Sequence, residues 1–482
     1  MKPRVAPGLG GLRNEHLNSL VFNERSNASP KAKIAIEKLH EVGCHIAAGN
    51  LPWYFYVTWT ATSLAAVNKR ELEELEAGEL MDCRPVAKGN TFRKVFTATL
   101  LEPFKQAIID VTAPTQFGSG EKAGGSQLVF AAQLMLEANP SFVAISLDIK
   151  NAFNEVTRKV VLEKLWEDLR LRNLWYYFWR VKSINSYIGL GSGTKMQKAP
   201  FLCEEGEQQG AVESMALFTL GIDTANNETN NELREHDGAL ISGADDTYII
   251  GPPDIAFACL QRHKERVAKS GLELQLTKTK AYIHASHRNQ EYHLSRAGID
   301  EGHTIDMNGV KSYGINVYGI PVGSDKYIKA ILEKQATRIE KSIETTKTKM
   351  DPEQIIAPEL PGRQCCWALT LRCIQHMGNY WTRHIPPHLT AAFCTRIDAS
   401  VQTMVIASTQ LDSTTLSPFT VERMKLPIKC KGMGLHSLYD RQYAEYVGGD
   451  DTRYPTTTKE IITNWITNYW ENEYPLSRKM GR

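Results

Sequence analysis

The sequence predicts an α+β fold, and three observations support that prediction. The length of 482 residues corresponds to roughly three domains of about 150 residues. Short apolar runs of strand length lie in the middle of the chain, at 142–147, 239–242 and 247–250. After about residue 325 the apolar spacing becomes helical, and prolines mark the breaks. We therefore expect a mixed helix-and-sheet middle and a last third that is mainly helical.

The composition describes an ordinary globular chain. A content of 42% hydrophobic and 23% charged residues excludes collagen-like, disordered and disulfide-scaffold proteins. The nine cysteines include no C-x-x-C spacing, so we expect reduced thiols, no zinc ribbon and an intracellular protein, in either nucleus or cytoplasm. A formal net charge of +2 argues against bulk electrostatic coating of nucleic acid, but it is compatible with a local basic groove.

The N-terminal part is predicted to be helical. Apolar spacing predicts a helix over 31–48, a polar one over 69–79 and a third over 92–111. Residues 46–68 carry no charge and are long enough to span a bilayer. The glycine, asparagine and proline within this stretch favour a buried helix with an aromatic face instead. No membrane contact is therefore predicted.

The apolar period changes at residue 142. The run 142–147 predicts a strand that ends at Asp148, and Thr157 is a good N-cap for a helix that runs to Asp168. The side chains expected to point inward from this helix are Val160, Val161, Leu165 and Trp166. Further along, strands at 239–242 and 247–250 meet at 244–246, and a helix over 255–270 follows.

Three carboxylates fall where these strands end. Asp148 closes the first strand, and Asp245 and Asp246 lie at the turn of the hairpin. Like charges that lie close together resist joint ionisation unless a cation neutralises them. Two divalent ions would do so and would suit an in-line displacement at phosphorus. The alternative is that Asp-Asp is simply a favourable turn pair.

The sequence around these carboxylates resembles the motifs of reverse transcriptases. Residues 147–154 resemble motif A, 206–210 motif B and 244–246 motif C. Two further stretches, 271–280 and 319–323, are similar to motifs D and E of non-LTR retrotransposon enzymes. Upstream, 84–94 resembles the fingers motif that meets the incoming triphosphate. The motifs occur in the complete family order, so the chain is identified as similar to a retroelement reverse transcriptase.

This resemblance implies a right-hand polymerase fold. Fingers and palm would occupy residues 1–315, with the palm formed by a small antiparallel sheet backed by helices. The motif E region and a helical thumb would occupy 316–450, and 451–482 would be a C-terminal tail. The helix over 326–350 carries seven lysines or arginines against three glutamates. It would lie along the duplex backbone, although a solvated helix face explains the same charges.

The implied activity is RNA-directed DNA synthesis, in which dNTPs extend a DNA or RNA primer on an RNA template. Two Mg²⁺ ions, with Mn²⁺ as an alternative, would be held by Asp148, Asp245 and Asp246 together with the carbonyl of Ile149. Lys278 would donate a proton to the leaving group, and its alternative is a solvated lysine. The nucleotide-binding residues implied by the resemblance are Arg84, Lys88, Arg93, Phe153, Gln209 and Gly210.

Within this set, the side chains have distinct implied roles. The two arginines and Lys88 would meet the phosphates. Phe153 lies five residues after Asp148, where an aromatic ring blocks the 2′-hydroxyl and so favours dNTP over rNTP. Its alternative is a core residue under the sheet. Gln209 and Gly210 would contact the incoming nucleotide and the template base, since glycine admits a close approach of the backbone.

Some positions depart from the family pattern. Ala-Val-Glu-Ser at 211–214 replaces the usual Asp-Pro-Leu-Ser, Gly243 replaces an aromatic residue, and Gln275 replaces an asparagine. Two alternatives therefore stay open: a catalytically decayed relative that only binds nucleic acid, and an RNA-dependent RNA polymerase. No ribonuclease H, endonuclease or integrase pattern is visible, so we expect either that a partner or another chain supplies the endonuclease or integrase function, or that the element is truncated.

Overall fold

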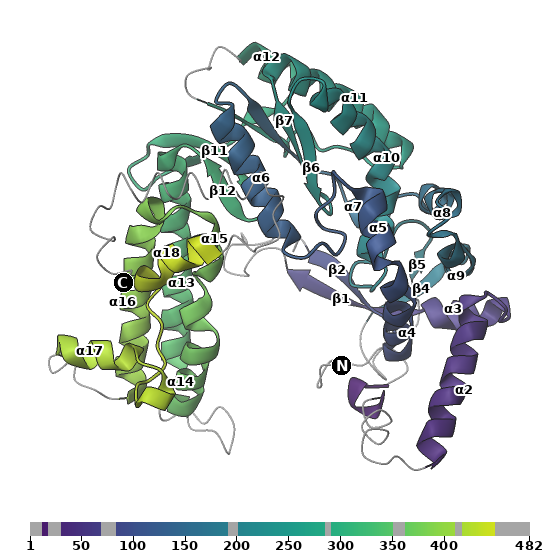
Figure 1. The fold of residues 1–482 in the computed structure, drawn as a ribbon, viewed down its shortest axis with the longest axis horizontal. Coiled ribbons are helices and arrows are strands. Elements are labelled where there is room, and N and C mark those ends of the chain that lie inside the picture. The colour runs from purple at the N-terminus through teal and green to yellow at the C-terminus, as the bar shows by residue number, and fades with distance from the viewer. Residues whose placement is uncertain are drawn as a thin grey trace, which may run out of the picture. The chain divides into compact units, whose positions relative to one another are not determined.

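The computed structural model describes residues 12–17, 30–68, 83–190, 201–284, 291–349, 362–409 and 417–448 (Figure 1). The chain divides into two compact units. Unit 1 comprises residues 1–124, 145–279 and 292–299, and unit 2 comprises 125–144, 280–291 and 300–482. Both contain helices and strands, so the predicted α+β class is confirmed. Among the described residues, no helix is long and apolar enough to cross a membrane.

The first part of unit 1 combines helices with a four-stranded sheet in the order β2-β1-β4-β5. Strands β1 and β2 pair antiparallel from Ser63↔Lys88 to Asn68↔Cys83. The elements are α2 (Pro30–Ala47), α3 (Trp53–Thr60), β1 (Thr62–Asn68), β2 (Cys83–Lys88), α4 (Thr91–Leu101), α5 (Lys105–Thr112), β4 (Ser186–Leu190) and β5 (Phe201–Cys203).

Two helix predictions here need correction, and one lies outside the described residues. The uncharged stretch 46–68 is not one helix, because the backbone becomes extended at Ala61 and continues as β1. The predicted helix over 92–111 is divided into α4 and α5 by a short 3₁₀ turn that contains Pro103. The helix predicted over 69–79 falls outside the described residues. The helix predicted over 31–48 is confirmed as α2.

The second part of unit 1 carries the hairpin with the acidic turn. Strand β7 pairs antiparallel with β6, and the apolar residues of both strands are buried except Ala239, which is half-buried. Helix α10 packs against β6, α8 and α11, with buried residues on most of its faces. The elements are β3 (Val143–Leu147), α7 (Ala152–Glu155), α8 (Arg158–Glu167), α9 (Arg172–Lys182), α10 (Ser214–Arg234), β6 (Ala239–Gly243), β7 (Asp246–Gly251), α11 (Pro253–Lys269) and α12 (Glu291–Ala297).

Helix α8 was predicted with four inward side chains, and the prediction is wrong for one of them. Val161 and Leu165 are fully buried, whereas Trp166 is 44% exposed. Trp166 instead contacts Trp175 edge to face on α9, and the guanidinium of Arg172 lies 4.8 Å from the centroid of its ring. The tryptophan therefore lies on the surface between α8 and α9 and not in the core.

A buried histidine gives unit 1 a predictable sensitivity to acid. His263 on α11 is fully buried, and its Nδ1 lies 2.9 Å from the hydroxyl of Thr229. Burial, together with the charge of Arg266, lowers the pKa of His263 to about 4. The unfolded chain, with the ordinary pKa, binds the proton more readily than the folded one. The folded state should therefore lose about 3 kcal/mol as the pH falls from about 6.5 to about 4.

We expect His263→Gln to remove this pH dependence, because glutamine can still bond Thr229 but does not titrate. Urea unfolding at several pH values between 4.5 and 7 would show a shallower loss of stability for the variant. If the free energy of unfolding fell equally with pH in both proteins, His263 would not be the source of the acid sensitivity.

Unit 2 contains short strands followed by helices, which confirms the predicted helical last third. Strand β8 pairs in parallel with β9, and β10-β11-β12 form an antiparallel sheet. Helices α13, α14 and α18 each pack on α16. The elements are α6 (Gly124–Ala138), β8 (Lys280–Ile283), β9 (Asp300–Glu301), β10 (His303–Ile305), β11 (Lys311–Val317), β12 (Ile320–Gly323), α13 (Asp325–Lys349), α14 (Gly362–Arg372), α15 (Asn379–His384), α16 (Pro387–Thr409), α17 (Pro418–Lys425) and α18 (Leu438–Gly448).

Helix α6 explains why the units differ from the predicted domains. His384 on α15 lies 2.8 Å from the hydroxyl of Ser126, and the amide of Gln133 donates to the carbonyl of His384 at 3.0 Å. These contacts place 125–144 in unit 2, far in sequence from the rest of it. The boundary predicted at residue 315 falls inside unit 2, and the tail predicted at 451–482 lies outside the described residues.

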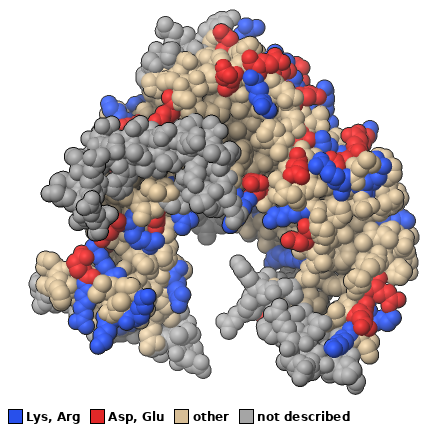
Figure 2. Space-filling view, viewed as in Figure 1, with Lys and Arg blue, Asp and Glu red and all other residues tan. Residues whose placement is uncertain are grey.

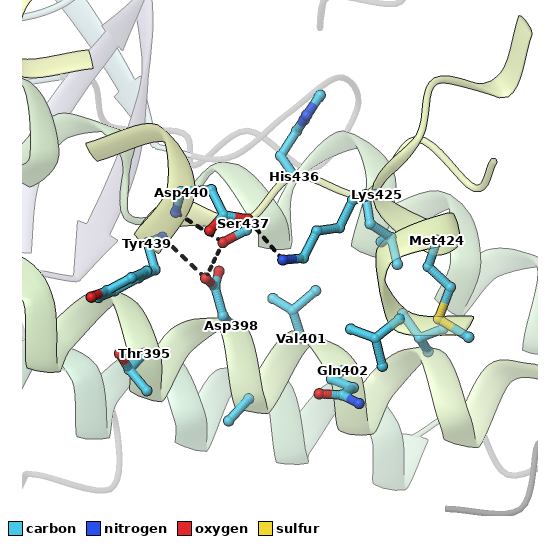
Figure 3. Close-up of a pocket in the computed structure, with 14 residues that line it drawn as sticks. Thr395, Asp398, Val401, Gln402, Met424, Lys425, His436, Ser437, Tyr439 and Asp440 are labelled. Carbon is cyan, nitrogen blue, oxygen red and sulfur yellow. Dashed lines mark hydrogen bonds and ion pairs between the residues drawn. The ribbon is translucent and has the colours of Figure 1, made fainter. Parts of the chain in front are cut away.

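A cavity of about 430 Å³ lies between α16, α17 and α18 (Figure 3). Its lining includes Asp398, whose carboxylate accepts hydrogen bonds from the Ser437 hydroxyl at 2.7 Å and the Tyr439 N–H at 3.0 Å. The ammonium of Lys425 forms an ion pair with the carboxylate of Asp440 at 2.7 Å. These groups fix the start of α18, so the polar lining of the cavity is explained by the fold.

Candidate active site

The hairpin of β6 and β7 carries two carboxylates at its tip. Pairing ends at Gly243↔Asp246, so Ala244 and Asp245 form a two-residue turn. The turn requires φ +63° at Ala244, a left-handed conformation that residues other than glycine rarely adopt. The short turn presents Asp245, which is half-buried, and Asp246, which is exposed. The predicted strands and their acidic turn are confirmed.

Asp148 follows β3 directly and is held by the segment 273–279. Its carbonyl accepts from the N–H of Gln275 at 2.8 Å, and its N–H donates to the Thr279 hydroxyl at 3.4 Å. Ile149 stands opposite Leu274 in an isolated bridge, between two interstrand hydrogen bonds. Its own carbonyl therefore points away from that segment. The stretch predicted as motif D thus supports the stretch predicted as motif A.

The three aspartates lie within one another's electrostatic field. Burial raises the pKa of Asp245, and the charge of Asp148 raises it further, whereas Arg84 lowers it. The carboxyl of Asp246 is partly exposed, yet desolvation by its surroundings, Asp245 and Asp148 together raise its pKa to about 6. The structure therefore brings together the three carboxylates that were predicted to cooperate, and it places the Arg84 guanidinium in the same field.

The donor chemistry of this cluster fits a divalent cation. Carboxylate and carbonyl oxygens are the ligands that Mg²⁺ prefers, and mutual repulsion among the aspartates favours a neutralising charge. In the part of the chain that the structure describes, no group of three or more Asp, Glu, His or Cys side chains is arranged so that it could hold a metal ion. The residue types fit Mg²⁺, but the arrangement of the described side chains does not itself form a metal site.

Gln116 supports the acidic turn and was not predicted from the sequence. Its side-chain oxygen accepts from the N–H of Ala244 at 2.6 Å, and its nitrogen donates to the carbonyl of Ala244 at 3.3 Å. The backbone beside it is joined to β6, since the N–H of Phe117 donates to the carbonyl of Ser242 at 2.7 Å. Both backbone groups of the residue with positive φ are thus held by one buried side chain. In the sequence, the one feature that could have drawn attention to Gln116 is its position two residues before Gly118.

The loop 203–214, which contains the predicted motif B, joins the other predicted site residues. The N–H of Glu207 donates to the carbonyl of Phe153 at 2.5 Å, and the carbonyl of Gln209 accepts from the N–H of Ala87 on β2 at 2.7 Å. Gly206 has φ +70°, and a Cβ there would lie 2.0 Å from the carbonyl oxygen of Asn154. The backbone of this loop therefore packs directly against motif A on one side and β2 on the other.

Phe153 is half-buried, and its ring stacks on Phe218 of α10. The two ring centroids are 4.6 Å apart at an interplanar angle of 28°. Phe218 is fully buried, so it fixes one face of the Phe153 ring. The ring is thus held firmly while part of it stays accessible, which is compatible with a steric role at the surface.

The predicted phosphate-binding residues separate into two groups. Arg84 is exposed and Lys88 half-buried, and both lie on the same face of β2 because they are four residues apart. Lys94 on α4 lies close to Lys88, because its pKa is lowered by partial burial and by the charge of Lys88. Arg93 is only 5% exposed and pairs with Glu213 at 2.5 Å. The structure therefore does not bring Arg93 to the surface that Lys88 and Lys94 share.

Lys278 and Gly210 complete the predicted set. Lys278 is exposed in a turn within the segment 273–279 that supports Asp148, and its N–H donates to the carbonyl of Gln275 at 3.1 Å. Gly210 is exposed with φ +92°, and a Cβ there would lie 2.9 Å from Val86 on β2. This close approach of loop and strand requires glycine at 210.

Comparison with protein families supports the interpretation of these motifs. The family model described as "Reverse transcriptase (RNA-dependent DNA polymerase)" matches residues 78–321, just over half of the chain. The matched range contains every predicted site residue, from Arg84 to Lys278. A comparison with curated proteins finds no match. The order of the motifs, the convergence of Asp148 with the acidic turn and the family match agree, and the chain belongs to the reverse transcriptase (RNA-dependent DNA polymerase) family.

Proposed function

We propose that this chain is an active RNA-directed DNA polymerase that transfers a nucleotidyl group from a dNTP to the 3′-hydroxyl of a primer on an RNA template. The observation that supports this most strongly is the shared electrostatic field of Asp148, Asp245 and Asp246 within the matched family region. A decayed relative would have no reason to retain three mutually repelling carboxylates at one site, because their repulsion destabilises the fold.

In this proposal the three aspartates, with the carbonyl of Ile149, hold two Mg²⁺ ions. When bound, the ions would activate the primer hydroxyl and neutralise charge on the triphosphate. Arg84, Lys88 and Lys94 contribute fixed positive charge to the triphosphate and to the departing pyrophosphate. Lys278 on its exposed turn gives a proton to the pyrophosphate as it leaves.

In the same proposal, the elements of the two units form the fingers, palm and thumb of a right-hand polymerase. The sheet of β1 and β2 with α4 forms the fingers, and β3, β6 and β7 with α10 form the palm. The helices of unit 2 form the thumb. Figure 2 shows Lys and Arg side chains gathered on the visible face of the helical part of unit 2. These cations contact the phosphates of the primer–template duplex, which positions it without reading its sequence.

Primer extension tests the proposal directly. Purified chain would be given a primer on an RNA template with Mg²⁺ or Mn²⁺ and either dNTPs or rNTPs, beside an Asp245→Ala/Asp246→Ala variant. We expect extension with dNTPs, lost in the variant. Extension with rNTPs alone would assign the chain to the RNA polymerases. Folded protein that binds the duplex but extends nothing would support the decayed relative.

The choice between dNTP and rNTP is predicted to depend on Phe153. Phe153→Val removes the ring that would meet a 2′-hydroxyl, so the ratio of kcat/KM for dNTP over rNTP should fall at least about tenfold. The matched control is Phe218→Leu, which disturbs the same stack from its buried side. If Phe153 were only a core residue, both variants would slow dNTP and rNTP addition alike and leave the ratio unchanged.

A further inference from the structure

Five charged side chains are buried around the loop 203–214, which carries Gln209. Each is at most 8% exposed, although none of them belongs to the aspartate cluster. They come from three helices and from the loop itself: Arg93 of α4, Arg158 of α8, Lys182 of α9, and Glu207 and Glu213 of the loop. Charged residues are almost never fully buried unless they are paired, so the grouping requires an explanation.

Four of these charges form two ion pairs, one on each side of Gln209 in the sequence. The ammonium of Lys182 lies 2.5 Å from one carboxylate oxygen of Glu207, two residues before Gln209. The guanidinium of Arg93 lies 2.5 Å from the carboxylate of Glu213, four residues after it. Burial alone would raise the pKa of the Glu213 carboxyl, but Arg93 and Lys182 outweigh it and hold that pKa below its ordinary value. Both ends of the segment 207–213 are therefore fixed by charge.

Arg158 holds the start of the same loop through its backbone. Its guanidinium donates to the carbonyl of Cys203 at 2.9 Å and to that of Gly206 at 3.4 Å. It also donates to the carbonyl of Lys182 at 3.2 Å, so it joins the loop to the end of α9. One buried cation thus fixes both the loop and the residue that pairs with Glu207.

The five charged residues fix the backbone next to Phe153 and Gln209, the two residues assigned to nucleotide selection. Glu207 not only pairs with Lys182 but also donates its N–H to the carbonyl of Phe153. A displacement of Glu207 would therefore move Phe153 and Gln209 together. A buried ion pair contributes little net stability because desolvation offsets the attraction, whereas it does define one geometry. The glutamate at 213, where the family motif usually has leucine, is matched here by Arg93 and does not indicate decay.

We propose that Arg93, Arg158, Lys182, Glu207 and Glu213 are positioning residues that hold the loop 203–214 against Phe153 and so determine the discrimination between dNTP and rNTP. This inference rests on the proposed function, because discrimination is a property of the polymerase reaction. It requires no contact between these five residues and the substrate.

The test removes one ion pair without leaving an unpaired charge. In the Lys182→Met/Glu207→Gln double variant both charges are lost together, so folding should be largely retained. We expect the kcat/KM ratio of dNTP over rNTP to fall about tenfold, mainly through a higher KM for dNTP, since displacement of positioning groups impairs orientation. A fall in the folded fraction would lower both nucleotide rates equally, so the ratio separates positioning from stability.

A third ion pair, in which Asp223 is buried and Lys164 is half-buried, provides the control. Lys164 and Asp223 join α8 to α10 at 2.6 Å, and neither belongs to the loop 203–214. The Lys164→Met/Asp223→Asn double variant should leave the discrimination ratio unchanged. If the Lys182/Glu207 double variant also kept the wild-type ratio, the proposal would be overturned.

Hydrogen exchange separates this inference from the proposed function. The amide of Glu207 is bonded to Phe153, so it should exchange slowly in the wild-type chain and at least about tenfold faster in the Lys182→Met/Glu207→Gln variant. If the wild-type chain made no DNA, the proposed function would fail, and exchange would still decide whether the charges hold the loop. Unchanged exchange at this amide would contradict the inference whatever the activity.

Discussion

Asp245→Asn is expected to lower the rate of single-nucleotide addition about a thousandfold, because a lost ligand to the ions removes several kcal/mol of charge stabilisation in the transition state. The same change should raise the thermal stability of the metal-free chain. Asp245 lies in the field of Asp148 and Asp246, so an amide at this position relieves like-charge repulsion. Opposite effects on rate and stability are characteristic of a site built for a cation.

The measurement is single-turnover incorporation of one dNTP beside a thermal unfolding scan without metal. Asp254→Asn is the control, since Asp254 is a largely exposed carboxylate at the start of α11 that pairs with His293 at 3.1 Å. The control should keep the wild-type rate. A rate for Asp245→Asn within about threefold of wild type would remove Asp245 from the proposed chemistry.

Gln116→Leu is expected to cost about 3 kcal/mol of unfolding free energy and to lower the rate at least about tenfold. The leucine side chain can make none of the bonds to the N–H and carbonyl of Ala244. Ala244 is held at φ +63°, which residues other than glycine adopt only at an energetic cost. Without Gln116 the turn should relax and displace both aspartates that follow it.

A second substitution distinguishes loss of the turn from general loss of packing. Ala244→Gly adopts positive φ without strain, so it should restore part of the rate lost by Gln116→Leu. Chemical denaturation and single-nucleotide addition of both single variants and the double variant would measure the coupling. Strictly additive effects, or a Gln116→Leu protein as stable and active as wild type, would show that Gln116 does not hold the turn.

The acidic centre could be predicted because local signals were sufficient there. Apolar runs of strand length ending in aspartate predicted β3 and the hairpin, and family order supplied the link between Asp148 and Asp245. The stretch 46–68 was misinterpreted because an uncharged aromatic run has no period that separates helix from strand. Its β-branched residues near Thr62 were the available signal.

The role of Arg93 could not be predicted, because it depends on a distant partner. An arginine in a phosphate-binding motif is normally exposed, and its partner Glu213 lies 120 residues further along the chain. Only the tertiary structure shows that Glu213, which stands where the family motif usually has leucine, forms an ion pair with Arg93. Gln116 was missed for the same reason, since Ala244 is 128 residues away. Helix α6 likewise joins unit 2 through contacts that no local pattern encodes.

The proposed reaction requires that Asp148, Asp245 and Asp246 bind divalent ions. Substitution of Fe²⁺ for Mg²⁺, followed by peroxide, generates hydroxyl radicals that cut the backbone beside a bound ion. We expect cuts near residue 148 and near 245–246, suppressed by excess Mg²⁺ and lost in Asp245→Asn. Cuts confined to other segments, or cuts at these positions that Mg²⁺ does not suppress, would contradict it.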